Sequence, residues 1–310
     1  ASVAAPVATL PATTSTSGRA WGTAGRTIPV GGGLALEFTG LSADQGLALG
    51  DPPAIVGNPP SPLESPLRIS VFRADTEHAQ AFVPQGWNLG LQWRFEGESL
   101  EIAGRNFLAR VILEEGCATS ASLYTVEQAP LLFNEAVTNF CRVLVALGFS
   151  PPRAHLVHSC AVAVSTGNVA LFYGSSGAGK STLGGLATAA GRVVLSDDLN
   201  AIGRDSGGVY QVQAVPWTGD LGPRSWTDVR TGPLKGVFRL QKGDRHRVRP
   251  LHAAKALAGL ASCSPFLNAE PTHYEQLMSS LEGIVGDVPA FTLTFRRDPG
   301  CLDLVEEVLG

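Results

Sequence analysis

Apolar and polar residues alternate along the first half of the chain in short runs that are typical of β-strands. The runs are rich in aromatic and β-branched residues and are bounded by Gly, Glu or Asn. They are residues 67–72, 91–95, 100–104, 107–113 and 122–126. At residues 130–148 the apolar spacing becomes helical, and the pattern predicts a helix that begins at Pro130 and ends at Gly148. We therefore expect a small, mostly antiparallel, β-rich α+β subdomain over residues 34–150 that ends in a helix.

The second half of the chain alternates continuous apolar runs with helical patterns. The apolar runs predict strands at residues 155–164, 169–174, 192–196, 209–215, 236–241 and 291–295. Helical spacing predicts helices at residues 181–191, 250–262, 272–285 and 302–310. This alternation is typical of an α/β fold, in which helices cover a central sheet. We expect a mixed sheet of this kind over residues 151–310, after a break at the Pro-rich segment 150–153.

The segment before residue 34 has a different composition. Residues 1–33 are rich in Ala, Ser and Thr, contain two arginines and no acid, and end in three glycines. A transit peptide would carry more arginine and an amphipathic period, so this composition favours a disordered tail or linker. Residues 50–66 contain six prolines and are expected to be loop.

Overall composition limits the classes of partner. The chain has 310 residues, of which 44% are hydrophobic and 16% charged, and its net charge is −4. A net negative charge argues against nucleic acid and against acidic membrane surfaces as partners. We expect no membrane-spanning segment, because no apolar run reaches the ~20 residues that span a bilayer. Five cysteines without a C-x-x-C pair indicate reduced thiols in a cytoplasmic protein rather than disulfides or a zinc site. Nothing in the composition speaks against a homo-oligomer.

One glycine-rich segment carries the strongest chemical signal. Residues 174–181 fit the pattern G-x-x-x-x-G-K-[ST], with an apolar strand before the segment and a helical run after it. Glycines let backbone N–H groups curl around phosphate oxygens, Lys180 would reach the β- and γ-phosphates, and the Ser181 hydroxyl would hold Mg²⁺. The predicted nucleotide-binding residues are Gly174, Ser175, Ser176, Gly177, Ala178, Gly179, Lys180, Ser181 and Thr182. No N-K-x-D guanine-reading motif follows, which favours ATP over GTP.

Two adjacent carboxylates follow the next predicted strand. Asp197 and Asp198 lie 17 and 18 residues after Lys180, at the carboxyl end of that strand, where open α/β sheets bind ligands. Adjacent strand residues point to opposite sides, so one carboxylate can face Mg²⁺ while the other acts as a general base. The alternative is a turn or helix cap, in which Asp is common.

Residues 153–202 together resemble the HPr serine kinase/phosphorylase family, which shares its fold with ATP-dependent phosphoenolpyruvate carboxykinase. The resemblance implies that Asp198 is the catalytic base, that Asp197 and Ser181 approach the metal, and that Lys180 holds the phosphates. It also implies that His158, on the preceding strand, is the active-site histidine near the base. This sequence departs from the family in having Ser159 after that histidine and Thr182 where Glu is usual. Asp220 would be the second acidic metal ligand, or else an ordinary turn residue.

We therefore expect an ATP- and Mg²⁺-dependent kinase that phosphorylates a Ser or Thr hydroxyl of a protein, peptide or small molecule. The alternative is a P-loop ATPase or nucleotide-binding regulatory protein without kinase activity. A basic segment at residues 242–249 contains Lys242, Arg245, Arg247 and Arg249. It is expected to be a solvated hairpin, or else a clamp for phosphate or for an acidic peptide.

Overall fold

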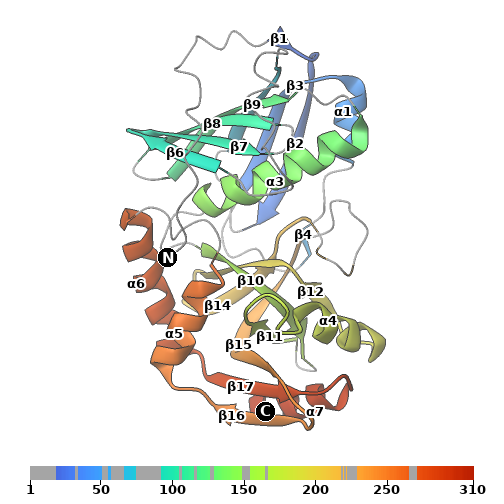
Figure 1. The fold of residues 1–310 in the computed structure, drawn as a ribbon, viewed down its shortest axis with the longest axis vertical. Helices are drawn as coiled ribbons and strands as arrows, with labels where there is room; N and C mark the ends of the chain where they lie inside the picture. The colour runs from blue at the N-terminus through green and yellow to red at the C-terminus, as the bar shows by residue number, and fades with distance from the viewer. Residues whose placement is uncertain are drawn as a thin grey trace, which may run out of the picture. The chain divides into compact units, whose positions relative to one another are not determined.

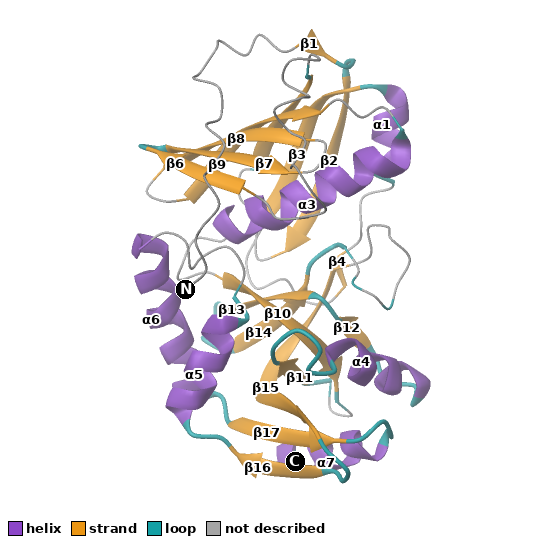
Figure 2. Ribbon diagram, in the orientation of Figure 1, coloured by secondary structure: helices purple, strands orange, loops and turns teal. Residues whose placement is uncertain are grey.

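The computed structural model contains two compact units, each with its own sheet (Figures 1 and 2). It describes residues 19–31, 34–50, 55–56, 66–74, 92–104, 107–114, 117–125, 129–148, 154–164, 167–217, 219, 221, 229–264 and 271–310. One unit comprises residues 1–27, 36–51 and 67–144, and the other comprises residues 28–35, 52–66 and 145–310. The fold is mixed α/β, as the sequence predicts.

The first unit is built on an eight-stranded sheet in the order β2-β3-β5-β9-β8-β7-β6, with β1 paired to β5. Its strands are β1 (Arg19–Ala20), β2 (Ala24–Gly31), β3 (Leu34–Leu41), β5 (Leu67–Arg73), β6 (Gln92–Glu96), β7 (Ser99–Gly104), β8 (Phe107–Glu114) and β9 (Cys117–Thr125). Its helices are α1 (Ala43–Ala48) and α3 (Pro130–Gly148). Strands β6 to β9 form an antiparallel meander, whereas β3, β5 and β9 run parallel to one another.

Two expectations for this part of the chain are wrong. Residues 19–31 form β1 and β2 rather than a tail or linker, because β-branched and apolar residues such as Ile28 and Val30 are buried. The second expectation is that no apolar segment is long enough to span a bilayer. Residues Pro130–Leu147 of α3 meet that criterion by length and composition. However, 56% of this segment is buried inside the protein, and its Phe140 contacts Phe107 of β8 edge to face. The contact is that of a core helix on a sheet.

The second unit is built on a nine-stranded sheet in the order β11-β10-β13-β14-β15-β17-β16, with β12 on β10 and β4 on β15. The strands are β4 (Ile55–Val56), β10 (Ala154–Ala163), β11 (Val169–Tyr173), β12 (Val194–Ser196), β13 (Leu199–Arg204), β14 (Tyr210–Ala214), β15 (Val229–Lys242), β16 (Arg247–Pro250) and β17 (Ala290–Phe295). The helices are α4 (Lys180–Ala189), α5 (Ala253–Ser262), α6 (Pro271–Asp287) and α7 (Gly300–Leu309). Strands β11, β15 and β17 run parallel, and β10 is antiparallel to β11.

Strand β10 lies between β11 on one edge and β13 and β12 on the other. Residues 154–158 pair with β13, whereas residues 159–163 pair with β11. The two pairings meet at His158, which is opposite Leu199, and Ser159, which is opposite Tyr173. The start of β13 and the end of β11 therefore lie at the same level of β10, on its two edges.

The two faces of this sheet are covered by different helices. On one face α4 and α7 pack on β11, β15 and β17, with Leu183, Ala187, Cys301 and Val305 among the buried side chains. A stack of three rings, Phe172, Phe238 and Phe291, continues across these strands with centroids 5.2 and 5.1 Å apart. The other face carries α5 and α6 (Figure 2): a Cβ at Gly259 of α5 would lie 2.7 Å from the Tyr173 ring.

The basic segment 242–249 is not a hairpin. Strand β17 lies between β15 and β16, parallel to β15 and antiparallel to β16. A strand from 48 residues further along the chain thus separates two runs that look adjacent in sequence. Local spacing cannot reveal an inserted strand of this kind.

Candidate functional site

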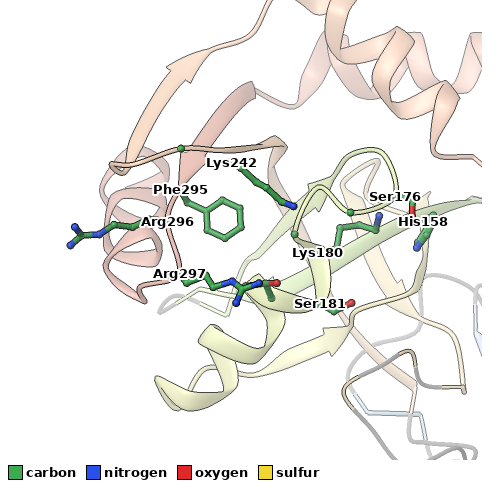
Figure 3. Close-up of a pocket in the computed structure, with 12 residues that line it drawn as sticks. His158, Ser176, Lys180, Ser181, Lys242, Phe295, Arg296 and Arg297 are labelled. Carbon is green, nitrogen blue, oxygen red and sulfur yellow. The ribbon is translucent and has the colours of Figure 1, made fainter.

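A cavity of about 600 Å³ lies where the parallel strands of the second unit end (Figure 3). The carboxyl ends of β11, β15 and β17 meet at one edge of the sheet, as is usual for ligand sites of α/β folds. The lining residues are His158, Ser176, Gly177, Gly179, Lys180, Ser181, Thr182, Lys242, Gly243, Phe295, Arg296 and Arg297. Four of these twelve are cations and none is a carboxylate, so the cavity suits a polyanion.

The glycine loop connects buried strand β11 to helix α4, which begins at Lys180. Gly177 and Gly179 adopt φ values of +76° and +109°, which side chains rarely tolerate. Gly179 also has no room for a side chain, because a Cβ there would lie 2.8 Å from Cζ of Phe295. The first N–H groups of a helix have no intrahelical partner and form its positive end, so this loop presents α4 to an anion in the cavity.

Lys180 is buried and its ammonium donates a hydrogen bond to the Gly174 carbonyl at 3.0 Å. The Cys263 thiol donates to the same oxygen at 3.6 Å. An ammonium has three N–H bonds, so Lys180 can hold the loop and still donate to a phosphate. In Figure 3 the Lys242 side chain extends toward the loop and Arg297 points toward Ser181, whereas Arg296 points away.

His158 and Asp198 form a pair beside this cavity. His158 Nε2 lies 3.6 Å from Asp198 Oδ1, and the two side chains are 46% and 21% exposed. The register of β10 and β13 explains the pairing, because Asp198 immediately precedes Leu199, the residue opposite His158. The backbone N–H of Ser159 donates to the Asp198 carbonyl at 2.9 Å and fixes that residue beside the strand.

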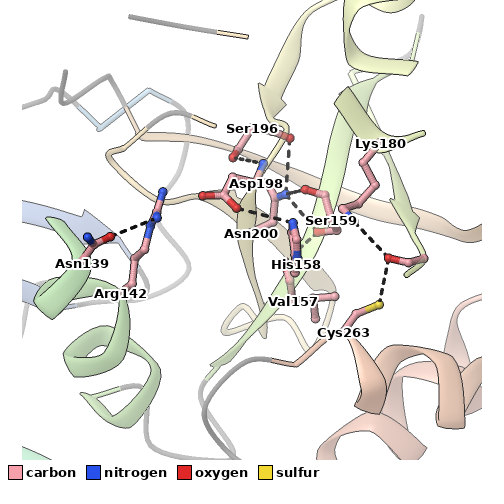
Figure 4. A network of polar contacts seen from close by, with 11 residues as sticks. Asn139, Arg142, Val157, His158, Ser159, Lys180, Ser196, Asp198, Asn200 and Cys263 are labelled. Carbon is pink, nitrogen blue, oxygen red and sulfur yellow. Dashed lines mark hydrogen bonds and ion pairs between the residues drawn. The ribbon is translucent and has the colours of Figure 1, made fainter. Parts of the chain in front are cut away.

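A buried amide supports the pair (Figure 4). The Asn200 side chain donates to the Ser159 carbonyl at 2.9 Å and to the Ser159 hydroxyl at 3.1 Å. The Asp198 N–H donates to the Ser196 hydroxyl at 3.2 Å. These bonds hold the bend between β12 and β13, in which both aspartates lie. Asp197 and Asp198 are therefore not strand residues, although they directly follow β12.

Asp197 has different surroundings from Asp198. It is buried, its Cβ would lie 3.6 Å from a Cβ at Gly184 of α4, and Gly219 lies against its carboxylate. Ser181 is three residues before Gly184 and so shares that face of the helix. Burial raises the pKa of the neighbouring Cys160 thiol, and the Asp197 charge adds to this while Lys180 opposes it. Asp197 thus lies next to helix α4, and Asp198 lies next to His158.

Magnesium fits these residues only together with a phosphate-bearing ligand. The described residues contain no group of three or more His, Cys, Asp or Glu side chains that could hold a metal ion. Mg²⁺ is usually held by one or two carboxylates, substrate phosphates and water. The Ser181 hydroxyl and the Asp197 carboxylate would therefore be suitable protein ligands. Asp220, the other predicted ligand, lies outside the described residues.

Sequence analysis overlooked several lining residues. Phe295 ends a predicted strand and Arg296 and Arg297 directly follow it, so the rule that placed Asp197 and Asp198 at a strand end applies to them equally. Asn200 gave no signal, because its role depends on the position of Ser159 in space. Lys242 was noted as part of a basic segment but not placed at the loop.

Comparisons with known proteins give little beyond this geometry. No family model and no curated protein matches the sequence. The structure is similar to that of the HPr(Ser) kinase/phosphatase from Coxiella burnetii, at 11% identity and a TM-score of 0.26. The similarity covers 50% of this chain and 93% of that one. A TM-score of this size does not establish a shared fold or function.

Proposed function

We propose that the second unit binds ATP with Mg²⁺ in the cavity and transfers the γ-phosphate to a hydroxyl of a protein, peptide or small molecule. The observation that carries the proposal is the His158–Asp198 pair, 3.6 Å apart, beside a cavity that contains the glycine loop and four cations. A nucleotide-binding site alone would not need a partly exposed carboxylate held by a histidine next to it.

The residues divide the reaction among them. The loop N–H groups, Lys180 and Lys242 would bind the phosphates, and Arg297 would add positive charge where the transferring group passes. Mg²⁺, held by Ser181 and Asp197, would neutralise charge on the β- and γ-phosphates. Asp198 would accept the proton of the acceptor hydroxyl. The oxygen of that hydroxyl would form a bond to the γ-phosphorus while the bond from the γ-phosphorus to ADP breaks. His158 would orient the Asp198 carboxylate.

The test replaces the base without removing the nucleotide site. We expect Asp198→Asn to lower phosphoryl transfer by about 10²- to 10⁴-fold, because an amide cannot accept the proton. Its affinity for ATP should stay within about twofold of wild type, because Asp198 does not line the cavity. Transfer is measured with γ-labelled ATP and Mg²⁺ in a lysate of the source cell, and binding by calorimetry.

Asp244→Asn is the matched control, because that carboxylate is 88% exposed and pairs only with Arg245 among the described residues. It should transfer phosphate like wild type. Full transfer by Asp198→Asn would refute its assignment as the base. Release of free phosphate by the wild type, with no labelled acceptor, would instead favour a nucleotide-hydrolysing regulatory protein.

A further inference from the structure

On the face of its sheet that carries α5 and α6, the second unit presents an exposed basic surface next to the cavity. It consists of Arg239 and Gln241 of β15, Thr292 and Thr294 of β17, and Arg247 and Arg249 of β16. We name these six residues the basic sheet face. They share one side because Arg239, Thr292 and Arg249 are opposite one another across the three strands, as are Gln241, Thr294 and Arg247.

The alternate residues of these three strands point to the opposite face and form part of the core. Leu240, Leu293 and Val248 pack into the core beneath α4 and α7. The side chains of the basic sheet face do not contribute to that core, and all three of its arginines are exposed. Their presence is therefore not explained by packing.

The arginines also lack counter-charges. Among the residues that the structure describes, no carboxylate pairs with Arg239, Arg247 or Arg249, whereas nearby Arg245 pairs with Asp244 at 3.7 Å and Arg296 with Asp298 at 3.1 Å. From strand geometry, Arg247 and Arg249 are ~7 Å apart along β16, and Arg249 and Arg239 are ~10 Å apart across two ladder spacings. Three like charges so close repel one another and favour an anionic partner.

We propose that the basic sheet face docks an extended acidic peptide segment of the phosphoryl acceptor. Acidic residues two positions apart in an extended peptide are also ~7 Å apart, so each can meet one arginine. The surface leads to the cavity, because Thr294 is followed by Phe295 and Arg296, and Gln241 by Lys242, all of which line it. This inference rests on the proposed function in taking the docked chain to be the acceptor.

A peptide fits this surface better than a nucleic acid. Proteins that hold single-stranded nucleic acid stack its bases on aromatic side chains. The uncharged members of the basic sheet face are threonine and glutamine, and the aromatic rings of these strands, Phe238, Phe291 and Phe295, pack in the core. The net charge of −4 adds no general attraction for a polyphosphate.

The test measures binding of a defined probe. The probe is a fluorescein-labelled peptide of about nine alternating Glu and Ser residues, and its comparison has Gln in place of Glu. We expect the Glu peptide alone to bind, and to bind more weakly in about 300 mM than in about 50 mM NaCl. Arg247→Ala/Arg249→Ala should raise its Kd about tenfold, the effect of losing two exposed charge pairs.

Arg245→Ala is the matched control, since it removes a neighbouring arginine that already has a partner, and it should leave the Kd unchanged. Circular dichroism and calorimetric ATP binding confirm that each variant is folded. An unchanged Kd in the double variant would overturn the proposal, as would tighter, arginine-dependent binding of a single-stranded DNA of similar length. Arginine-dependent peptide binding in a protein that transfers no phosphate would refute the proposed function and leave the docking surface standing.

Discussion

The glycine loop offers a comparison that separates backbone strain from steric conflict. Gly177 and Gly179 both have positive φ, but a Cβ at Gly177 would meet nothing within 4 Å, whereas one at Gly179 would lie 2.8 Å from Cζ of Phe295. The variants Gly177→Ala and Gly179→Ala therefore share the backbone strain of a positive φ, but only Gly179→Ala adds a steric conflict. Phe295 cannot easily move away, because it is 4% exposed and belongs to the core of the unit.

The expected magnitudes follow from these two terms. A left-handed alanine costs about 1–2 kcal/mol, and the smaller conformational freedom of the unfolded chain returns about 0.4–1 kcal/mol. Gly177→Ala should then lower the free energy of unfolding by about 1 kcal/mol. Overpacking against a buried ring adds about 1–3 kcal/mol, so Gly179→Ala should lose about 2–4 kcal/mol.

The assay combines urea unfolding with calorimetric titration of ATP. Gly179→Ala should bind ATP at least about tenfold more weakly than Gly177→Ala, because relieving a clash of about 1–3 kcal/mol displaces the loop. Adding Phe295→Leu to Gly179→Ala should restore part of both losses, because the shorter side chain leaves space for the new methyl group. Equal effects of the two alanines, or no rescue by leucine, would refute the loop conformation described above.

Two further predictions concern buried polar groups of β10 and β13. Asn200→Ala removes the donor to the Ser159 carbonyl and should lower the free energy of unfolding in urea by about 1–3 kcal/mol. We also expect a lower kcat with little change in ATP affinity. A variant that transfers phosphate at the wild-type rate would show that the amide does not position Asp198. Burial lowers the pKa of His155 to about 4 from 6.5, so the unfolded state binds more protons between those values. Stability should be full above pH ~6.5 and fall by about 2 kcal/mol at pH ~5. His155→Gln should flatten this slope, and an unchanged slope would mean that other groups produce it.

Much of the architecture of the second unit is legible in the sequence because its signals are local. The apolar runs for β11 and β17 and the helical spacing of α5 need only neighbouring residues. The Gly174–Ser181 motif likewise depends on a strand, a turn and a helix in succession, and the structure has these three elements in that order. The strands within residues 19–31 were not predicted, because glycines and small residues interrupt the apolar pattern and the burial of these strands comes from distant partners.

The residues of the candidate site could be predicted only where their signal is local in the sequence. Asp197 and Asp198 stand at a strand end close to the loop in sequence, so a spacing argument reaches them. Arg297 is more than a hundred residues from the loop, and it approaches Ser181 only because β11 and β17 end at the same edge of the sheet. The role of Asn200 likewise depends on a carbonyl 41 residues earlier in the chain.

The sequence by itself determined the glycine loop between β11 and α4, because its glycines directly shape the backbone. It also determined that two carboxylates would follow within one helix and one strand. Only the tertiary structure decided which carboxylate meets His158, because that depends on the register in which β13 pairs with β10. Only the tertiary structure also placed β17 between β15 and β16 and so gathered three arginines on one face, since pairing between distant strands leaves no local trace.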